Sequence, residues 1–105
     1  MKSSSGKPLS AQQLKSMRAI AHQLKPVVTI AQNGLSESVS RELDQTLERH
    51  ELIKVKLVIA DRELRKQVIA DMAKKLKAEI VQEIGKVALI FRESKKPNLK
   101  LSNIR

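Results

Sequence analysis

The clearest structural signal in this chain is the alternation of side chains between residues 52 and 59. From Ile53 to Ile59 every second position is aliphatic, whereas Lys54 and Lys56 lie at positions between them. Successive side chains of a β-strand point to opposite faces of a sheet. The segment therefore predicts a strand with one apolar and one partly polar face, and the rest of the chain is interpreted around it.

Three helices are predicted from capping residues that precede apolar positions spaced by three and four. The first starts at Ser10, in a Ser-Ala-Gln-Gln capping box, and ends at Lys25-Pro26. The second follows Ser36 and ends near His50, and the third follows Asp61. Their predicted inner faces are Leu14, Met17, Ile20, Ala21 and Leu24; Val39, Leu43 and Leu47; and Leu64, Val68, Ile69, Met72 and Leu76.

Three further strands are predicted at residues 27–30, 79–84 and 87–92. Gly85-Lys86 suits a two-residue type II′ hairpin turn with glycine first, which makes the last two strands antiparallel. Strands joined through a helix are expected to be parallel. The order α-β-α-β-α-β-β thus predicts one α/β domain with a mixed four-stranded sheet and helices packed on it.

Cysteine and long apolar segments are both missing from the sequence. The lack of cysteine excludes thiol catalysis and disulfides and fits a reducing compartment. No apolar run approaches the roughly 20 residues of a membrane-spanning helix. Residues 1–7 are serine-rich with two lysines and lack the apolar stretch of a signal peptide. We expect a disordered basic tail over residues 1–8 and a cytoplasmic protein with no membrane partner.

The formal net charge of +10 is concentrated at the two ends of the chain. Residues 1–36 contain five basic residues and no acidic one, and residues 86–105 contain six basic residues and one acid, Glu93. The middle segment, 37–85, has ten of each kind and is neutral. If the two ends meet in space, this segregation indicates a face that binds a polyanion.

Phe91 is the only aromatic residue. Proteins that read single-stranded nucleic acid usually stack bases on aromatic side chains, so this chain is not expected to use such a platform. Phosphate contacts, shape and backbone amides remain as means of recognition.

Four groups of residues are candidates for binding a polyanion. The first is a stripe on the opening helix, which no acid interrupts; the alternative is a solvated helix face. The second is the loop before the second helix, where unpaired N–H groups suit a phosphate, although its glycine alone is better explained by a turn. The third is a lysine pair about 6.7 Å apart on one strand face, equally well explained by solvated lysines. The fourth lies at the hairpin tip and toward the C-terminus. These groups are Lys15, Arg18, His22 and Lys25; Ala31, Gln32, Asn33 and Gly34; Lys54 and Lys56; and Lys86, Arg92, Lys95, Lys96 and Lys100.

Catalysis has little support in the sequence. His22 and His50 lack metal-ligand spacing, and no carboxylate cluster accompanies them. There is no glycine-rich nucleotide-binding loop and no serine in a nucleophile elbow. We therefore expect no enzyme activity, no metal or cofactor and no small-molecule substrate.

Several segments together resemble the CRM domain family, and specifically its single-domain bacterial members of the YhbY type. The resemblance covers about Leu9 to Ser94. Its strongest parts are residues 9–28, Asn33-Gly34-Leu35-Ser36-Glu37 and the block from His50 to Lys56, followed by residues 82–86 and Phe91-Arg92.

The resemblance implies a fold similar to the C-terminal domain of a bacterial translation initiation factor. It also implies RNA binding and association with precursors of the large ribosomal subunit. The family's Gly-x-x-Gly loop falls on residues 31–34, where Ala31 replaces the first glycine. Lys54 and Lys56 become stronger candidates for RNA contact.

These observations lead to one expected organisation. Residues 9–94 form the CRM-type domain, and residues 95–105 form a loose basic tail. The chain is expected to be a monomer that binds rRNA in precursors of the large subunit and assists ribosome assembly. A factor acting on mature subunits and a non-specific DNA-binding protein are the alternatives.

Overall fold

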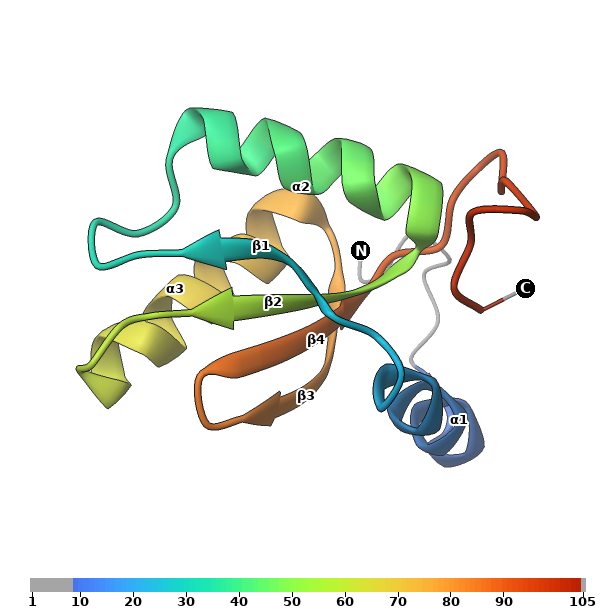
Figure 1. Ribbon diagram of the computed structural model, residues 1–105, viewed down its shortest axis with the longest axis horizontal. Coiled ribbons are helices and arrows are strands. Elements are labelled where there is room, and N and C mark those ends of the chain that lie inside the picture. Colours follow the sequence, from blue (N-terminus) through green and yellow to red (C-terminus); the bar gives the residue numbers. More distant parts are fainter. Residues whose placement is uncertain (1–8, 105) are drawn as a thin grey trace.

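The computed structural model describes residues 9–104. The predicted disordered tail, residues 1–8, lies outside the described residues, as does Arg105. Helices and strands follow the predicted order along the chain (Figure 1). Their bounds are α1 Ala11–Ala21, β1 Pro26–Ile30, α2 Glu37–His50, β2 Leu52–Leu57, α3 Arg62–Leu76, β3 Glu79–Ile84 and β4 Val87–Phe91. None of the helices described is both long and apolar enough to cross a bilayer.

The predicted capping residues start all three helices. Ser10 forms a complete capping box: its Oγ accepts from the Gln13 N–H at 3.1 Å, and Gln13 Oε1 accepts from the Ser10 N–H at 2.8 Å. Ser36 Oγ caps α2, and Asp61 Oδ1 caps α3. Each cap satisfies N–H groups that have no partner within the helix.

The four strands form one mixed sheet in the order β1-β2-β4-β3. β1 is parallel to β2, whereas β4 is antiparallel to both β2 and β3. Ile84 pairs with Val87 around the Gly85-Lys86 turn. Of the two turn residues only Gly85 has a positive φ, 56°, as a type II′ turn requires. The predicted fold class is confirmed.

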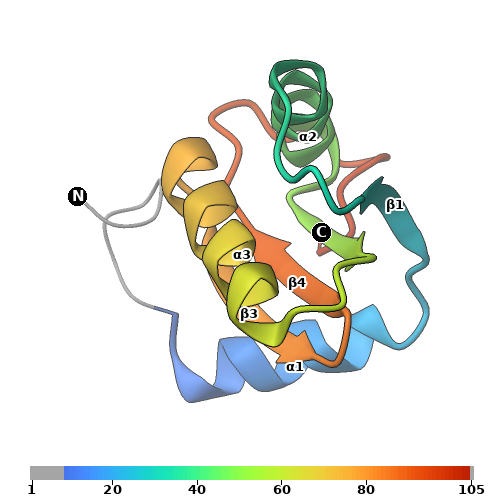
Figure 2. The ribbon, with the colours of Figure 1, turned by 90° about the vertical axis from the view of Figure 1, so that its left-hand side faces the viewer.

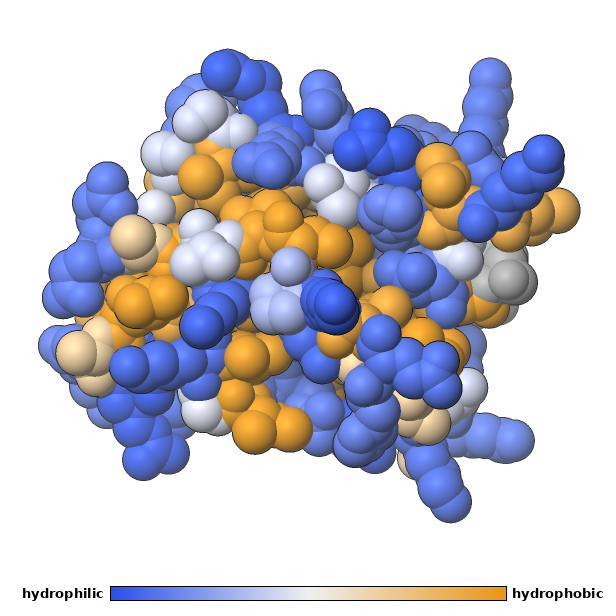
Figure 3. Space-filling model, viewed as in Figure 1, coloured by the Kyte–Doolittle hydropathy of each residue, from blue (hydrophilic) through white to orange (hydrophobic). Residues whose placement is uncertain are grey.

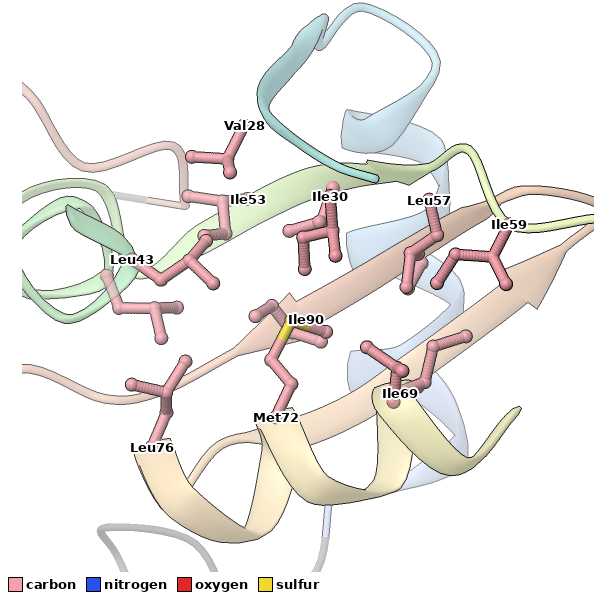
Figure 4. Packing of buried hydrophobic residues seen from close by; sticks show 14 residues of the cluster. Val28, Ile30, Leu43, Ile53, Leu57, Ile59, Ile69, Met72, Leu76 and Ile90 are labelled. Atoms are coloured by element: carbon pink, nitrogen blue, oxygen red, sulfur yellow. The ribbon is translucent and has the colours of Figure 1, made fainter. Parts of the chain in front are cut away.

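The two faces of the sheet are covered by different helices (Figure 2). α2 and α3 cover one face, where Leu43, Ile69 and Met72 pack against strand residues such as Ile30 and Ile90 (Figure 4). α1 crosses the other face, and its apolar side packs in a second, smaller cluster of Met17, Ala21, Leu52, Val81, Leu89 and Phe91. A single short helix thus covers the second face, and part of that face remains open.

Two helix details differ from the sequence prediction. Leu64, predicted on the inner face of α3, is 39% exposed, because the first turn of α3 lies beyond the tip of β2 (Figure 1). α1 ends at Ala21, earlier than predicted, and the chain continues through a turn closed by Gln23 N–H to Ile20 O and Leu24 N–H to Ala21 O. Lys25 therefore follows the helix and is not part of it.

The segment after Ser94, expected to be loose, is held against the domain. Ser94 N–H and Ser102 Oγ donate to the two oxygens of the buried Glu51 carboxylate, at 2.7 and 2.8 Å. Asn103 Nδ2 donates to Leu52 O at 2.6 Å, and Ile104 packs on the α1 cluster. These contacts join distant parts of the sequence, so no local pattern predicted them.

Candidate nucleic-acid interface

α1 presents its basic residues beside the open part of the sheet. Met17 and Ala21 are buried against the sheet, which turns Arg18 and His22 toward the neighbouring strands. Lys15 and His22 are exposed, whereas Arg18 is half-buried. Three of the four stripe residues thus lie along α1 and its C-terminal cap.

A hollow of about 320 Å³, here called the α1 hollow, lies between α1 and the sheet. Basic side chains stand around it: Arg18 from α1, His22 from its C-terminal cap and Lys54 from β2. The other lining residues are Ala21, Gln82, Ile84, Val87 and Leu89. No carboxylate belongs to this lining, so the three basic side chains face a site without an opposing charge.

A second hollow of about 200 Å³, here called the β1 hollow, shares Lys54 with the first. Lys25 and His50 also line it, with Asn103 from the C-terminal segment; the remaining lining residues are Gln23, Leu24, Val27 and Ile53. His50 Nδ1 lies 2.7 Å from Leu101 O. Because a carbonyl oxygen only accepts, Nδ1 is the donor in this contact. Lys25, although outside the helix, thus remains close to Lys54.

Lys56 extends the same face of β2 toward the predicted loop. It is exposed and pairs with Thr29 of β1, two residues before Ala31. Lys54 and Lys56 alternate with the buried Val55 and Leu57, as the sequence predicted. The lysine face therefore runs from the α1 hollow toward the 31–34 loop.

Residues 31–34 form a tight turn in which the Gly34 N–H donates to Ala31 O at 2.9 Å. Gly34 has a φ of 82°, a value that side chains disfavour, whereas Ala31 is not among the residues with positive φ. Gln32 and Asn33 are exposed. Ala31 thus has a backbone conformation that does not need glycine.

The start of α2 is less free for a phosphate than the sequence suggested. Ser36 Oγ already accepts from the Val39 N–H at 3.2 Å. Glu37, in the first helical turn, adds a negative charge at the same end and pairs with Lys75 at 3.5 Å. An anion here would compete with both, so Gln32, Asn33 and Gly34 are stronger candidates than the helix terminus.

The guanidinium of Arg92 is engaged in contacts within the protein. Its Nη1 donates to Asp44 Oδ1 at 2.7 Å and to Leu76 O at 3.1 Å, and its Nη2 donates to Asp44 O at 2.9 Å and lies 3.4 Å from Glu48 Oε1. Its side chain is only 12% exposed. These contacts join β4 to α2 and α3 and occupy the guanidinium, so we omit Arg92 from the interface.

The other predicted basic residues are exposed but spread out. Lys86 lies at the β3–β4 turn, beside Val87 of the α1 hollow. Lys95 and Lys96 follow Ser94, whose Oγ donates to Glu48 near the end of α2. Within residues 9–104, neither Lys95 nor Lys96 lines either hollow. The C-terminal segment reaches the basic face through Asn103 instead.

Comparison with known proteins identifies the fold's relatives. Residues 9–92 match the family model of the CRS1/YhbY (CRM) domain. The chain belongs to this family. The resemblance predicted from the sequence is therefore confirmed.

Several relatives of this CRM domain are bacterial proteins that match it over most of their own length. A Pseudomonas aeruginosa protein named a probable RNA-binding protein is 46% identical over 96 residues, covering 91% of this chain and 92% of its own length. A Haemophilus influenzae protein named an RNA-binding protein is 40% identical over 93 residues, with coverages of 89% and 94%. The solution structure of Staphylococcus aureus SAV1595, described as a candidate RNA-binding protein, has a TM-score of 0.73 and 32% identity and covers 85% of this chain and 93% of its own.

Sequence reasoning missed one basic cluster of this CRM domain. Arg62, Arg65 and Lys66 of α3 line a hollow of about 260 Å³ with Glu83 and Gly85 at the hairpin. Arg65 Nη1 also donates to Ile59 O at 2.7 Å. The summed charge of residues 37–85 is zero, which concealed this cluster. The signal was the spacing of three and four residues, which places the cations on one helix face.

No group of three or more potential metal ligands forms within residues 9–104.

Proposed function

We propose that this CRM domain binds structured RNA through phosphate contacts and shape. The interface, here called the α1–β2 face, consists of Lys15, Arg18, His22, Lys25, Lys54 and Lys56, with Gln32, Asn33 and Gly34 at its end. One observation supports it most: cations from α1 and β2 surround a hollow whose lining contains no acid. The names of the relatives, which refer to RNA binding, agree with this proposal.

Three acidic residues lie on the side of the molecule that faces away from the α1–β2 face. Asp44 and Glu48 are paired with Arg92, and Glu37 is paired with Lys75. All three lie on α2, which covers the opposite face of the sheet. An RNA backbone approaching the α1–β2 face would therefore meet mainly positive charge, as phosphate recognition requires.

The RNA bound in the cell is, in this proposal, rRNA in precursors of the large ribosomal subunit. The protein would act there in the cytoplasm as a monomeric assembly factor without catalytic activity. This finer role rests on the family resemblance. A basic, shape-reading face without aromatic platforms suits an rRNA helix or junction better than an extended single strand.

In-cell crosslinking followed by sequencing of the bound RNA tests this role, together with a gradient profile of ribosomal particles. We expect crosslinks to large-subunit rRNA and co-sedimentation with precursor particles. Protein found on mature subunits and absent from precursors would favour a translation-associated factor. Preferential binding of duplex DNA over structured RNA at equal salt would contradict RNA as the partner.

A further inference from the structure

The α1 hollow combines two surfaces of opposite character. Ile84 and Val87 provide accessible aliphatic surface, with the buried Leu89 and Ala21 beside them, while Arg18, His22 and Lys54 stand around it. A site for phosphates alone would need only the cations. The aliphatic part therefore calls for a ligand that has an apolar surface next to its negative charge.

Part of this aliphatic surface is exposed because α1 ends before it covers it. Ile84, at the end of edge strand β3, is 63% exposed, and Val87 beside it is half-buried. α1 covers Val81, Leu89 and Phe91 further along the sheet but ends at Ala21. Figure 3 shows apolar surface over β3 with hydrophilic side chains around it. An apolar lining with a few polar groups around it is typical of a ligand-binding pocket.

Gln82 adds a group that can recognise a polar edge. Its side chain lines the same hollow, and within residues 9–104 no hydrogen bond occupies its amide. A glutamine amide offers both donors and an acceptor. Together these residues provide an apolar contact surface, a polar amide, an imidazole and two cations.

We propose that the α1 hollow receives one unpaired nucleobase of the bound RNA. The base lies on Ile84 and Val87, its polar edge faces the Gln82 amide, and the flanking phosphates contact Arg18 and Lys54. At about 320 Å³ the hollow lies at the small end of ligand sites, which fits one nucleotide. This inference rests on the proposed RNA binding and adds that a bulged or looped-out base is recognised.

The test uses an RNA stem-loop with one unpaired adenine in its stem and the same stem-loop with that adenine deleted. We expect the parent protein to bind the bulged RNA about five- to tenfold more tightly than the paired RNA. This preference is at the lower end of the range for base contacts, because the base would lie on aliphatic and not on aromatic side chains. With 2-aminopurine at the bulge, fluorescence should rise on binding, because the base leaves its stack and no aromatic side chain lines the hollow.

Ile84→Ser and Gln82→Ala should each reduce the preference for the bulged RNA while leaving the affinity for the paired RNA unchanged. Ile80→Ser is the matched control, since Ile80 lies on the same strand, is 38% exposed and pairs with Ile90 of the opposite face. Thermal melts would confirm that all three variants fold.

Equal, salt-dependent binding of both RNAs by the parent would overturn the base site and leave the proposed function intact. A bulge preference that survives Ile84→Ser would also overturn it, because the base would then lie elsewhere. Failure of the parent to bind either RNA would instead contradict the proposed function itself.

Discussion

Gly34 combines a backbone requirement with a position in the proposed interface. Its φ of 82° disfavours any side chain, yet an added Cβ would lie 3.9 Å from Val68 Cγ2, an ordinary contact. Replacement by valine should therefore lower the free energy of unfolding through backbone strain, by about 1–2 kcal/mol. Asparagine tolerates positive φ better, so Gly34→Asn should regain most of this stability.

RNA binding separates the two roles of Gly34. If the loop contacts the RNA backbone, Gly34→Asn should be nearly as stable as the parent and still bind RNA poorly. Thermal melts and RNA titrations of both variants measure this. A Gly34→Asn protein that binds RNA like the parent would remove the loop from the interface and leave the interaction to α1 and β2.

Arg92 provides the opposite case, a basic residue with a structural role. Arg92→Gln should lower the free energy of unfolding by about 2–3 kcal/mol, because it leaves acceptors on α2 and α3 without a charged donor. RNA affinity below the melting temperature should not change. Arg18→Gln is the matched variant, with weaker RNA binding and little loss of stability. Urea denaturation and RNA titration that gave Arg92 the properties expected of Arg18 would contradict this assignment.

Local sequence patterns predicted the positions of some residues well, but the role of Arg92 poorly. Ser10, Lys54 and Lys56 followed from spacing within a few positions, and the structure places them as the spacing implied. The role of Arg92 could not be predicted, since its partner Asp44 is 48 positions away in the sequence. The sequence offered only its positive charge, which is equally consistent with an ion pair and with a phosphate contact.

At the scale of elements, α1 is the helix on which the proposed function depends. Replacing Lys15 and Arg18 of α1 and Lys25, which follows it, by glutamine (here called the α1 triple variant) should weaken RNA binding by roughly tenfold or more. Stability should change little, by about 0.5 kcal/mol or less at each of the exposed positions Lys15 and Lys25. A triple variant of Arg41, Lys74 and Lys75 on α2 and α3 removes the same charge from the opposite side and should bind nearly like the parent. Equal loss in both triples would mean that total charge, and not α1, determines binding.

Deletion of residues 98–105 tests whether the C-terminal segment contributes to the folded domain. Deleting them removes the hydrogen bond from Ser102 Oγ to the buried Glu51 carboxylate and the one from Asn103 Nδ2 to Leu52 O. We expect the melting temperature to fall by roughly 5–15 °C. A variant with Lys100 and Arg105 changed to glutamine matches the charge and should melt like the parent. A deletion variant with an unchanged melting temperature would show a loose tail.

The order of elements was predictable because each has its own local period and its own cap or turn. The type II′ turn at Gly85, for example, required only two residues and their flanking strands. The early end of α1 and the docking of Asn103 were not predictable, since both depend on which parts of the sheet are covered. Asn103 and its acceptor Leu52 lie 51 positions apart.

For the whole molecule, the central claim is that RNA binds electrostatically to the α1–β2 face. The two basic ends of the chain meet only in part: Lys25 and Asn103 line the same hollow as Lys54, whereas Lys95 and Lys96 line neither hollow. The α3 cluster of Arg62, Arg65 and Lys66 provides further positive charge at the hairpin. Binding should thus involve several phosphates on one side of the molecule.

The salt dependence of RNA affinity tests this claim most directly, measured for the parent, the α1 triple variant and its charge-matched control. Contact with four to six phosphates predicts a slope of log affinity against log salt of roughly −3 to −5 for the parent. The α1 triple variant should have a slope shallower by about 2–3, one unit per lost contact, and the control should keep the parent's slope. A slope near zero for the parent, or the same slope for the α1 triple variant, would contradict the account.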